Sequence, residues 1–254
     1  MFRRQGRGPR PVVSEAGALV LDGVGKRYRR GVTALAPVDL AVPRGHFLAV
    51  MGPSGSGKST LLQCAAGLDR PTTGTVRIGG VDVGSLSEAA LTRLRRERVG
   101  FVFQAHNLVP SLSVLENVSL PLLLAGVDDA DAARRALADV GLGGRADDRP
   151  TELSGGQQQR VAIARALVTS PEVVFADEPT GALDPVTAQD VLALLRQAVD
   201  RDGHTVVMVT HDPSAAAWTD EALFLTGGTV VERLLHPGAA QVHAVMRSLG
   251  RAAA

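Results

Sequence analysis

Short apolar runs separated by turn residues occupy the first third of this chain. They lie at residues 18–21, 38–42 and 75–78, and two glycines close the last of them. Strand-length runs that follow one another so closely, with tight turns between them, are typical of an antiparallel sheet. The pattern therefore predicts an antiparallel β layer early in the chain.

A different pattern begins at residue 99, where continuous apolar runs alternate with helical periodicity. The runs are residues 99–103, 173–176 and 206–209. Runs that are apolar throughout mark parallel strands covered on both faces, and the helices between them imply an open α/β sheet. Two further runs, 222–225 and 229–231, are expected to pair across Gly227 and Gly228.

A helical region interrupts this alternation. Residues 131–140 place apolar side chains on one helical face, and Gly141 stands where a C-terminal cap belongs. We expect an inserted α-helical subdomain at about 105–155, followed by a long helix over 157–168. The predicted organisation is a basic, disordered tail at 1–17, one domain at 18–235 and an Ala-rich tail at 236–254.

One stretch near the start of the domain carries a phosphate-binding pattern. It fits G-x-x-x-x-G-K-[ST] and lies between an apolar run at 47–50 and a helical segment at 59–66. In this pattern backbone N–H groups surround a phosphate chain at a helix N-terminus, where the helix dipole favours anions. We expect Lys58 to reach the β- and γ-phosphates and the Ser59 hydroxyl to bind Mg²⁺. The stretch consists of Gly52, Pro53, Ser54, Gly55, Ser56, Gly57, Lys58, Ser59 and Thr60.

The distribution of basic residues favours this interpretation over an ordinary Gly-rich turn. Only two of the 27 basic residues, Lys26 and Lys58, are lysine, and the rest are arginine. Lysine is a compact ammonium on a flexible stem and arginine a planar fork, so a phosphate cradle tolerates the exchange poorly. A lysine at this position of an Arg-rich chain indicates that the phosphate-binding loop requires lysine.

Composition narrows the class of protein. The 254 residues are 45% hydrophobic and 21% charged, which suits one large α/β domain or a domain with a nested subdomain. The net charge of +1 gives no overall case for nucleic-acid binding, and the single Cys64 rules out a disulfide framework within the chain. The longest apolar segment, residues 118–127, is too short for a membrane span. With no leader pattern, we expect a cytoplasmic protein.

Polar residues follow each of the three buried runs. They are Gln104, Asp177 with Glu178, and Thr210 with His211. Because ligands bind open α/β sheets at the carboxyl ends of the strands, these residues predict a single site. Asp177 could hold Mg²⁺ while Glu178 orients or deprotonates an attacking water. For His211 the ordinary alternative is a surface histidine after a strand.

Three other features have both a functional and an ordinary interpretation. Ser154 and two glycines precede a helix, whose N-terminus could hold a second anion or simply carry an N-cap. Asp184 before Pro185 fits the N-cap and first positions of the next helix. Tyr28, in a basic stretch, could stack on a base or be a half-buried surface aromatic.

Together these motifs resemble the nucleotide-binding subunit of ABC transporters over about residues 19–232. The likeness rests above all on the phosphate-binding loop combined with the Leu-Ser-Gly-Gly-Gln run. In the family's order the matching segments are 52–59, Gln104, 153–157, 175–180, 182–184 and 210–212. The resemblance implies a P-loop NTPase with a RecA-like parallel-sheet core, an antiparallel β subdomain and an inserted α-helical subdomain.

The resemblance also assigns roles to individual residues. It implies that Ser59, Gln104 and Asp177 bind Mg²⁺. Glu178 would be the catalytic base, and His211 would hold the γ-phosphate and sense its loss. The residues implied to bind ATP are Tyr28 at adenine, the loop residues Gly52, Ser54, Gly55, Ser56, Gly57, Lys58, Ser59 and Thr60, and Gln104, Ser154, Gly155, Gly156, Gln157 and Asp184. Lys58 joins Glu178 and His211 in the implied catalytic set.

In this family the 153–157 element completes the phosphate site of another subunit. Our hypothesis is that two copies enclose two ATP molecules, with Ser154 and Gly156 donating to the partner's γ-phosphate and Asp184 communicating across the interface. Hydrolysis then removes the charge that holds the copies together. The implied partners are a second ATP-binding subunit, most simply a second copy, and a permease on separate chains, with no nucleic acid. The chain would be peripheral at the cytoplasmic face of the membrane.

Within the family, residues 99–104, 107–110 and 116–122 resemble the ATPases of lipoprotein-releasing, macrolide-exporting and antimicrobial-peptide-handling systems. In that subgroup nucleotide-driven closure is thought to work a four-helix permease mechanically. Two departures from the family are His46, where Glu is usual, and residues 226–228, which replace an Asp-Gly turn. Neither is expected to touch the nucleotide.

Two alternatives belong to other functional classes. A soluble ABC ATPase acting on ribosomes or DNA usually has two such domains or a long coiled-coil insertion, and neither pattern occurs in this sequence. A nucleotide-binding regulator without turnover is disfavoured by Glu178 and His211. Finally, residues 118–127 are expected near the groove that receives a permease segment; core packing is the alternative, and the two can coexist.

Overall fold

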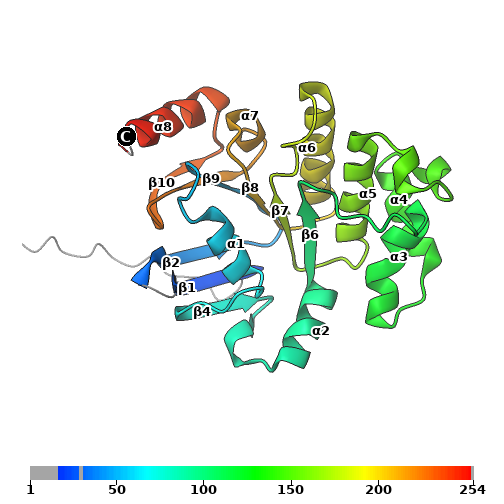
Figure 1. The fold of residues 1–254 in the computed structure, drawn as a ribbon, viewed down its shortest axis with the longest axis horizontal. Helices are drawn as coiled ribbons and strands as arrows, with labels where there is room; N and C mark the ends of the chain where they lie inside the picture. The colour runs from blue at the N-terminus through cyan, green and yellow to red at the C-terminus, as the bar shows by residue number, and fades with distance from the viewer. Residues whose placement is uncertain (1–16, 29–30, 253–254) are drawn as a thin grey trace, which may run out of the picture.

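The computed structural model describes residues 17–28 and 31–252 and folds them around two β-sheets (Figure 1). Their strands are β1 Leu19–Arg27, β2 Thr33–Val42, β3 Phe47–Met51, β4 Thr73–Ile78, β5 Val81–Asp82, β6 Val99–Phe103, β7 Val173–Asp177, β8 Val206–Val209, β9 Glu221–Thr226 and β10 Thr229–Leu235. The smaller sheet has the order β2-β1-β4-β5 and the larger one β10-β9-β3-β8-β7-β6. Nearly all of the predicted basic tail lies outside the described residues.

The larger sheet is parallel except at one edge. β3 pairs in parallel with β8 and β9, β7 pairs in parallel with β8 and β6, and only β10 is antiparallel. Every residue of β3 and β8 is buried, as their unbroken apolar sequence predicts for strands covered on both faces. Val209 at the end of β8 pairs with Val50 on one side and Asp177 on the other. The predicted convergence of these strand ends at one edge is therefore confirmed.

The smaller sheet is antiparallel throughout, as predicted. β1 pairs with both β2 and β4, and β4 pairs with β5. Its strands approach so closely that a Cβ added to Gly74 would lie 2.3 Å from the carbonyl oxygen of Gly23. Gly74 also has a φ of +80°, a conformation that glycine adopts without steric cost.

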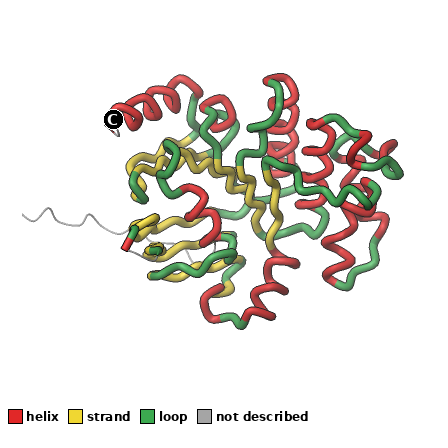
Figure 2. The backbone as a smooth tube through the Cα atoms, in the orientation of Figure 1, coloured by secondary structure: helices red, strands yellow, loops and turns green. Residues whose placement is uncertain are grey.

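Helices cover both faces of the larger sheet (Figure 2). They are α1 Lys58–Ala65, α2 Glu88–Arg98, α3 Val114–Ala125, α4 Ala130–Asp139, α5 Gly155–Leu167, α6 Pro185–Asp200, α7 Pro213–Ala216 and α8 Ala239–Ala252. α3, α4 and α5 pack on one another at the right of Figure 1, where the sequence predicts the start of a helical subdomain. Within the described part of the chain, no helix has the length and apolar character needed to cross a membrane.

Alternate side chains of β3 enter two separate hydrophobic clusters. Leu48 and Val50 pack with the smaller sheet, α1 and α2. Phe47, Ala49 and Met51 pack with α5, α6 and α8 on the opposite face. This period of two is the geometry of an extended strand, and it fixes the register of the strand that leads into the phosphate-binding loop.

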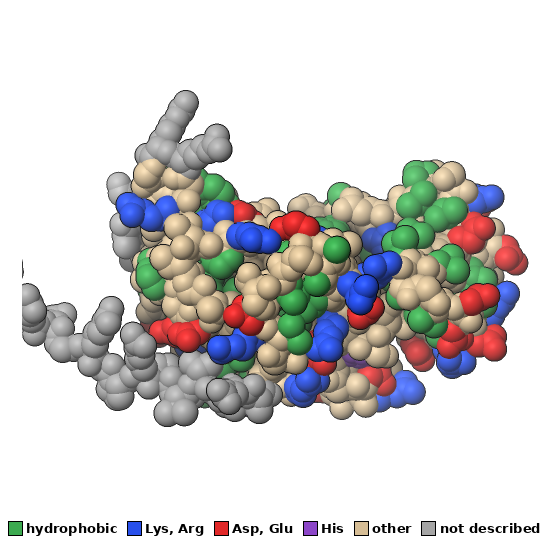
Figure 3. Space-filling view, turned by 90° about the horizontal axis from the view of Figure 1, so that it is seen from below, with side chains coloured by type: hydrophobic (Ala, Val, Ile, Leu, Met, Phe, Trp, Pro, Cys, Tyr) green, Lys and Arg blue, Asp and Glu red, His purple; other side chains and the backbone are tan. Residues whose placement is uncertain are grey.

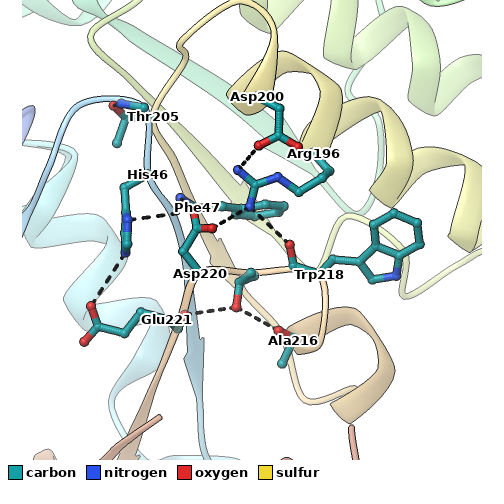
Figure 4. A network of polar contacts seen from close by, with 11 residues as sticks. His46, Phe47, Arg196, Asp200, Thr205, Ala216, Trp218, Asp220 and Glu221 are labelled. Atoms are coloured by element: carbon teal, nitrogen blue, oxygen red, sulfur yellow. Dashed lines mark hydrogen bonds and ion pairs between the residues drawn. The ribbon is translucent and has the colours of Figure 1, made fainter. Parts of the chain in front are cut away.

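A polar network fastens the start of β3 to its neighbours (Figure 4). Asp220 accepts a hydrogen bond from the Phe47 N–H at 2.8 Å and one from Arg196 at 2.9 Å, and Arg196 also pairs with Asp200 at 2.7 Å. The two nitrogens of His46 lie 3.7 Å from carboxylate oxygens of Asp220 and Glu221. A glutamate at position 46 would face both carboxylates, so histidine suits these surroundings better.

A fully buried amide anchors the beginning of α3. Asn117 accepts a hydrogen bond from the Val109 N–H at 2.8 Å. Its Nδ2 donates to the carbonyl oxygens of Val109, Leu112 and Ser113 at 3.1, 3.3 and 2.9 Å. This one side chain thus satisfies several backbone groups of the loop before α3.

The C-terminal segment, expected to be a tail, forms α8. Val242 of this helix is fully buried and belongs to the same hydrophobic cluster as Ala215 and Ala216 of α7. The Gly238 N–H donates to Gln241 at 3.0 Å where the helix begins. The Ala-rich C-terminal segment is therefore a helix that packs on the same hydrophobic cluster as α7.

The burial of Cys64 gives a test of this fold. Cys64 lies in α1 with no exposed surface, and burial raises the pKa of its thiol to about 11. Because the thiolate is the reactive form, Ellman's reagent at pH 8 should label the folded protein on the order of 10²-fold more slowly than the unfolded chain. The single thiol makes the absorbance change unambiguous. Rapid, complete labelling of the folded protein would contradict this packing.

Candidate nucleotide-binding site

The phosphate-binding loop joins β3 to α1 through glycines that no other residue could replace without strain. Gly52, Gly55 and Gly57 have φ values of +147°, +76° and +104°. A Cβ on Gly52 would lie 2.1 Å from the carbonyl oxygen of Leu225, and one on Gly57 would lie 2.5 Å from that of Ala34. The loop therefore lies so close to the backbone at Leu225 and Ala34 that only glycine fits at these two positions.

This loop forms a hollow that fits a phosphate group. The hollow has a volume of about 160 Å³. It is lined by Ala34, Gly55, Ser56, Gly57, Lys58, Ser59 and Thr60. The buried hydroxyl of Ser56 has no hydrogen-bond partner among the described residues, and the first N–H groups of α1 have no partners within their own helix. Such unsatisfied donors at a helix N-terminus are suited to an anion.

Lys58 is the first residue of α1 and its ammonium folds back over the loop. Its Nζ donates to the carbonyl oxygens of Gly52 at 2.8 Å and Pro53 at 3.0 Å. Burial lowers the pKa of Lys58, while the negative charges of Glu178 and Asp177 act in the opposite direction. The cation and the two carboxylates are thus close enough to influence one another, as the sequence predicts.

Asp177 ends β7 and faces the same region. Burial raises the pKa of its carboxyl group, the neighbouring Glu178 raises it further, and Lys58 opposes both. A half-buried carboxylate beside another one favours a bound cation. No group of three His, Cys, Asp or Glu side chains in the described ranges could hold a metal alone. Mg²⁺ would accordingly rely on phosphate oxygens and water besides Asp177 and Ser59, which is its usual preference.

Glu178 and His211 meet at the ends of neighbouring strands. Nδ1 of His211 lies 2.8 Å from Oε1 of Glu178. The imidazole is 70% exposed, while the carboxylate is 20% exposed. Glu178 also has a φ of +48°, and its N–H donates to the carbonyl oxygen of Val209 at 2.9 Å. The two side chains are therefore hydrogen-bonded to each other at the open edge of the sheet.

Gln104 follows β6 and lies against the turn after Glu178. A Cβ added to Gly181 would come within 3.0 Å of Nε2 of Gln104. Beyond Gln104 the chain turns through His106 and Asn107, both with positive φ, and Arg165 donates to their carbonyl oxygens at 2.8 and 2.7 Å. The sequence pattern gave no indication of this role for Arg165, because it depends on a contact between distant segments.

Ser154 and Gln157 form a complete capping box at the start of α5. The Ser154 hydroxyl accepts from the Gln157 N–H at 3.3 Å, and Oε1 of Gln157 accepts from the Ser154 N–H at 3.0 Å. The ordinary N-cap interpretation is thus confirmed. A Cβ on Gly156 would lie 2.2 Å from Cγ2 of Thr187, so this turn packs closely on the start of α6.

Asp184 caps α6 as its sequence predicts. Its carboxylate accepts from the Thr187 hydroxyl at 2.5 Å and from the N–H groups of Val186 and Thr187 at 3.1 Å each. The hydrogen bonds from Thr187, and the N–H of Val186, lower the pKa of the Asp184 carboxyl group. Through Thr187, therefore, the Asp184 cap and the Gly156 turn form one unit.

Tyr28 lies just past β1 with 42% of its surface exposed. Its hydroxyl donates to Asp69 at 3.3 Å, and the ammonium of Lys26 lies 5.2 Å from the ring centroid. Lys26 itself pairs with Asp69 at 2.5 Å and donates to the carbonyl oxygen of Arg70 at 2.7 Å. These contacts hold the partly exposed ring in place, and its contact with adenine stays a prediction.

Comparison with known proteins agrees with this geometry. The family model described as ABC transporter matches residues 35–181. The chain is 49% identical to the lipoprotein-releasing system ATP-binding protein LolD of Anaeromyxobacter dehalogenans, covering 83% of this chain and 91% of that protein. It is 44% identical to the macrolide export ATP-binding/permease protein MacB of Marinobacter nauticus over 88% of this chain, but it spans only 35% of that relative.

A solved structure shares most of this fold. A dimeric ATP-binding cassette in a post-hydrolysis state, bound to ADP and phosphate, superimposes with a TM-score of 0.78 and is 42% identical. The match covers 87% of this chain and 99% of that one. The predicted P-loop NTPase fold is thereby confirmed. The family model alone fits more than half of the residues, so this chain belongs to the ABC transporter family and is one of its ATP-binding, ATP-hydrolysing cassettes.

Proposed function

We propose that this chain energises a membrane transporter whose permease lies on separate chains. The observation that supports this most is the meeting of Lys58, Asp177, Glu178 and His211 at one sheet edge, beside a hollow of phosphate size. The LolD relative, which the chain matches over 91% of its length, is named an ATP-binding protein of a lipoprotein-releasing system. The MacB relative is named for macrolide export. Both names favour an export or mechanotransmission system, peripheral to the membrane.

Each residue of the site has a separate role in the proposed hydrolysis of ATP. Lys58 and the loop N–H groups bind the phosphates, and Ser59, Gln104 and Asp177 hold Mg²⁺, which neutralises phosphate charge when bound. Glu178 orients the attacking water and accepts its proton, since its carboxylate is mostly covered and its backbone N–H is hydrogen-bonded to Val209. His211, exposed and bonded to Glu178, is placed to contact the γ-phosphate.

The 153–157 turn serves a second copy of the chain. It packs on the start of α6, through Gly156 and Thr187, rather than on the phosphate-binding loop of its own chain. α5 lies across β6 and β7 from α1 in Figure 1. The solved relative bound to ADP and phosphate is dimeric. A head-to-tail pair would bring each turn onto the other copy's γ-phosphate, so that ATP itself closes the interface.

A groove beside α3 is the proposed contact for the permease. It has a volume of about 560 Å³ and lies between α2, β6 and the ends of α3 and α5. Leu124 lines it and is 57% exposed, whereas Val118 and Leu122 on the same helix are buried in the core. The 118–127 segment thus has a buried face and an exposed face, which supports a contact of the kind considered from its sequence. It packs the subdomain with one face and presents apolar side chains with the other.

The rim of this groove is positively charged. Arg95, Arg96 and Arg165 line it, and none of its described lining residues is acidic. Figure 3, viewed from below Figure 1, shows Lys and Arg side chains beside hydrophobic patches on the face that includes α2. A permease segment that inserts apolar side chains and flanks them with carboxylates would complement this surface.

Replacing Lys58 by Ala should weaken nucleotide binding. Loss of one charge-assisted contact to phosphate costs about ten-fold to a hundred-fold in affinity. Isothermal titration of the wild type and Lys58→Ala with MgATP measures this, and circular dichroism confirms that the variant is folded. Equal affinities in the two proteins would overturn the assignment of the phosphate-binding loop.

Replacing Glu178 by Gln should separate ATP binding from turnover. The amide keeps the shape of the side chain but cannot accept a proton, so kcat should fall by about 10²-fold or more. ATP then persists, and size exclusion in MgATP should show a stable dimer. The matched control is Glu97→Gln on the exposed surface of α2, which should behave as the wild type. A Glu178→Gln variant that stays monomeric in ATP would exclude the two-copy arrangement.

Replacing Leu124 by Glu should release the chain from its permease and spare its basal ATPase activity. The carboxylate places a charge in the apolar groove, where its desolvation disfavours docking. Sedimentation with membranes of its own cells measures how much of each variant binds to the membrane. Cross-linking then identifies the membrane protein that the chain contacts. Val231→Glu is the control, because Val231 is 44% exposed on β10 outside the groove. Equal membrane association of both variants would argue against this surface, and cross-linking to ribosomes or DNA would support the alternative class.

A further inference from the structure

The side chain of Gln159 reaches the backbone on both sides of the catalytic region. Gln159 lies in α5 and is fully buried. Its Nε2 donates to the carbonyl oxygen of Pro179 at 2.7 Å and to that of Phe103 at 3.3 Å. Pro179 directly follows Glu178, and Phe103 directly precedes Gln104. One amide therefore touches the two backbone segments that carry the proposed base and the proposed Mg²⁺ ligand.

The backbone at Glu178 needs such support. Its φ of +48° is a left-handed conformation that few residues other than glycine adopt. A proline follows it, and residues before proline are normally extended. Conformations of this kind persist only where the surroundings hold them. The holding contacts are the Glu178 N–H to the Val209 carbonyl oxygen, the Gly181 N–H to the Glu178 carbonyl oxygen, and the Gln159 bond to Pro179.

Packing alone does not account for an amide at this position. Oε1 of Gln159 is buried and meets no donor among the residues of 17–28 and 31–252. An unpaired buried acceptor is destabilising, and an apolar side chain of similar shape would avoid that cost. What the amide adds is the donor end, which faces two carbonyl oxygens. The amide of Gln159 is thus kept, despite its unpaired oxygen, at a position where it connects three segments of the chain.

The three successive glutamines of α5 have different contacts. Gln157 completes the capping box with Ser154. Gln158 donates to the carbonyl oxygens of Pro150 and Leu153 at 3.0 and 3.1 Å, within the approach to the helix. Of these three side chains, only Gln159 bonds to the segments next to Glu178 and Gln104.

We propose that Gln159 is a positioning residue that couples the start of α5 to the hydrolytic site of the same chain. It stands three residues after Gly156, less than one helical turn away, so the two move together. Under the proposed function, Gly156 meets the partner's nucleotide. A shift of α5 on that contact would pass through Nε2 to the turns at Glu178 and Gln104. The inference rests on that function, and Gln159 itself touches no substrate.

The test replaces Gln159 by Met, which is unbranched, of similar length and apolar. The variant loses both hydrogen bonds and the unpaired oxygen. A misplaced catalytic group can lose up to about 10²-fold in rate, so we expect kcat to fall about ten-fold or more. KM for ATP should change less than about two-fold, and Tm should fall only slightly, because removal of the unpaired oxygen offsets part of the loss of two hydrogen bonds. Because Gln104 is also displaced, half-activation should need several-fold more Mg²⁺.

The control is Asn117→Leu, which removes another fully buried amide that donates to backbone carbonyl oxygens. It should lower Tm and leave kcat and the Mg²⁺ requirement unchanged at temperatures where it is folded. Gln159→Leu is a second variant, used if the Met protein does not fold. A fall in kcat that merely follows Tm, as in an unstable protein, would overturn the coupling role, and so would a wild-type kcat in either Gln159 variant.

The same assays separate this inference from the proposed function. If Glu178→Gln forms an ATP-dependent dimer while Gln159→Met hydrolyses ATP normally, the coupling role is wrong and the proposed function stands. If Glu178→Gln neither stops turnover nor dimerises, the proposed function is wrong, and the coupling role that rests on it is wrong as well. A loss of kcat in Gln159→Met at nearly unchanged KM, measured where the variant is folded and accompanied by the raised Mg²⁺ requirement, supports the coupling.

Discussion

The parallel pairing of β3, β8 and β7 is the constraint on which the site depends. Val209 pairs with Val50 and with Asp177, so the ends of three strands that are distant in sequence lie side by side. The loop after β3, the carboxylates after β7 and the histidine after β8 then share one edge. Since burial on both faces fixes the register of these strands, the hydrophobic cores determine the position of the chemistry.

The sequence predicted those features whose cause is local. The phosphate-binding loop could be identified because its glycines and its lysine stand at fixed offsets between a strand and a helix. The capping roles of Ser154 and Asp184 followed from neighbouring residues, and the structure shows both. The fold class followed from two kinds of hydrophobic period, and the two sheets have the expected pairing.

Several side-chain contacts between distant segments were not predicted. Arg165 and Gln159 act on carbonyl groups about 58 and 20 residues away, and no spacing rule connects them. α8 has ordinary Ala-rich composition, and the burial of Val242, with the packing of Val245 and Met246 on the same cluster, shows that it belongs to the domain. The Glu178 turn is another example, because a left-handed glutamate before proline runs against local preference and exists only through tertiary contacts.

Two buried charged side chains of the site are also locally unfavourable. Their common explanation is the charged ligand that the site would bind. Burial raises the pKa of Asp177 and lowers that of Lys58, so each group is disfavoured in its charged form. A phosphate chain with a cation would stabilise both charges, because the phosphate attracts the ammonium and the cation attracts the carboxylate. One chain holds these groups in position without completing their neutralisation. Under the proposed function, closure on ATP would therefore relieve, in each copy, a cost that the fold itself imposes.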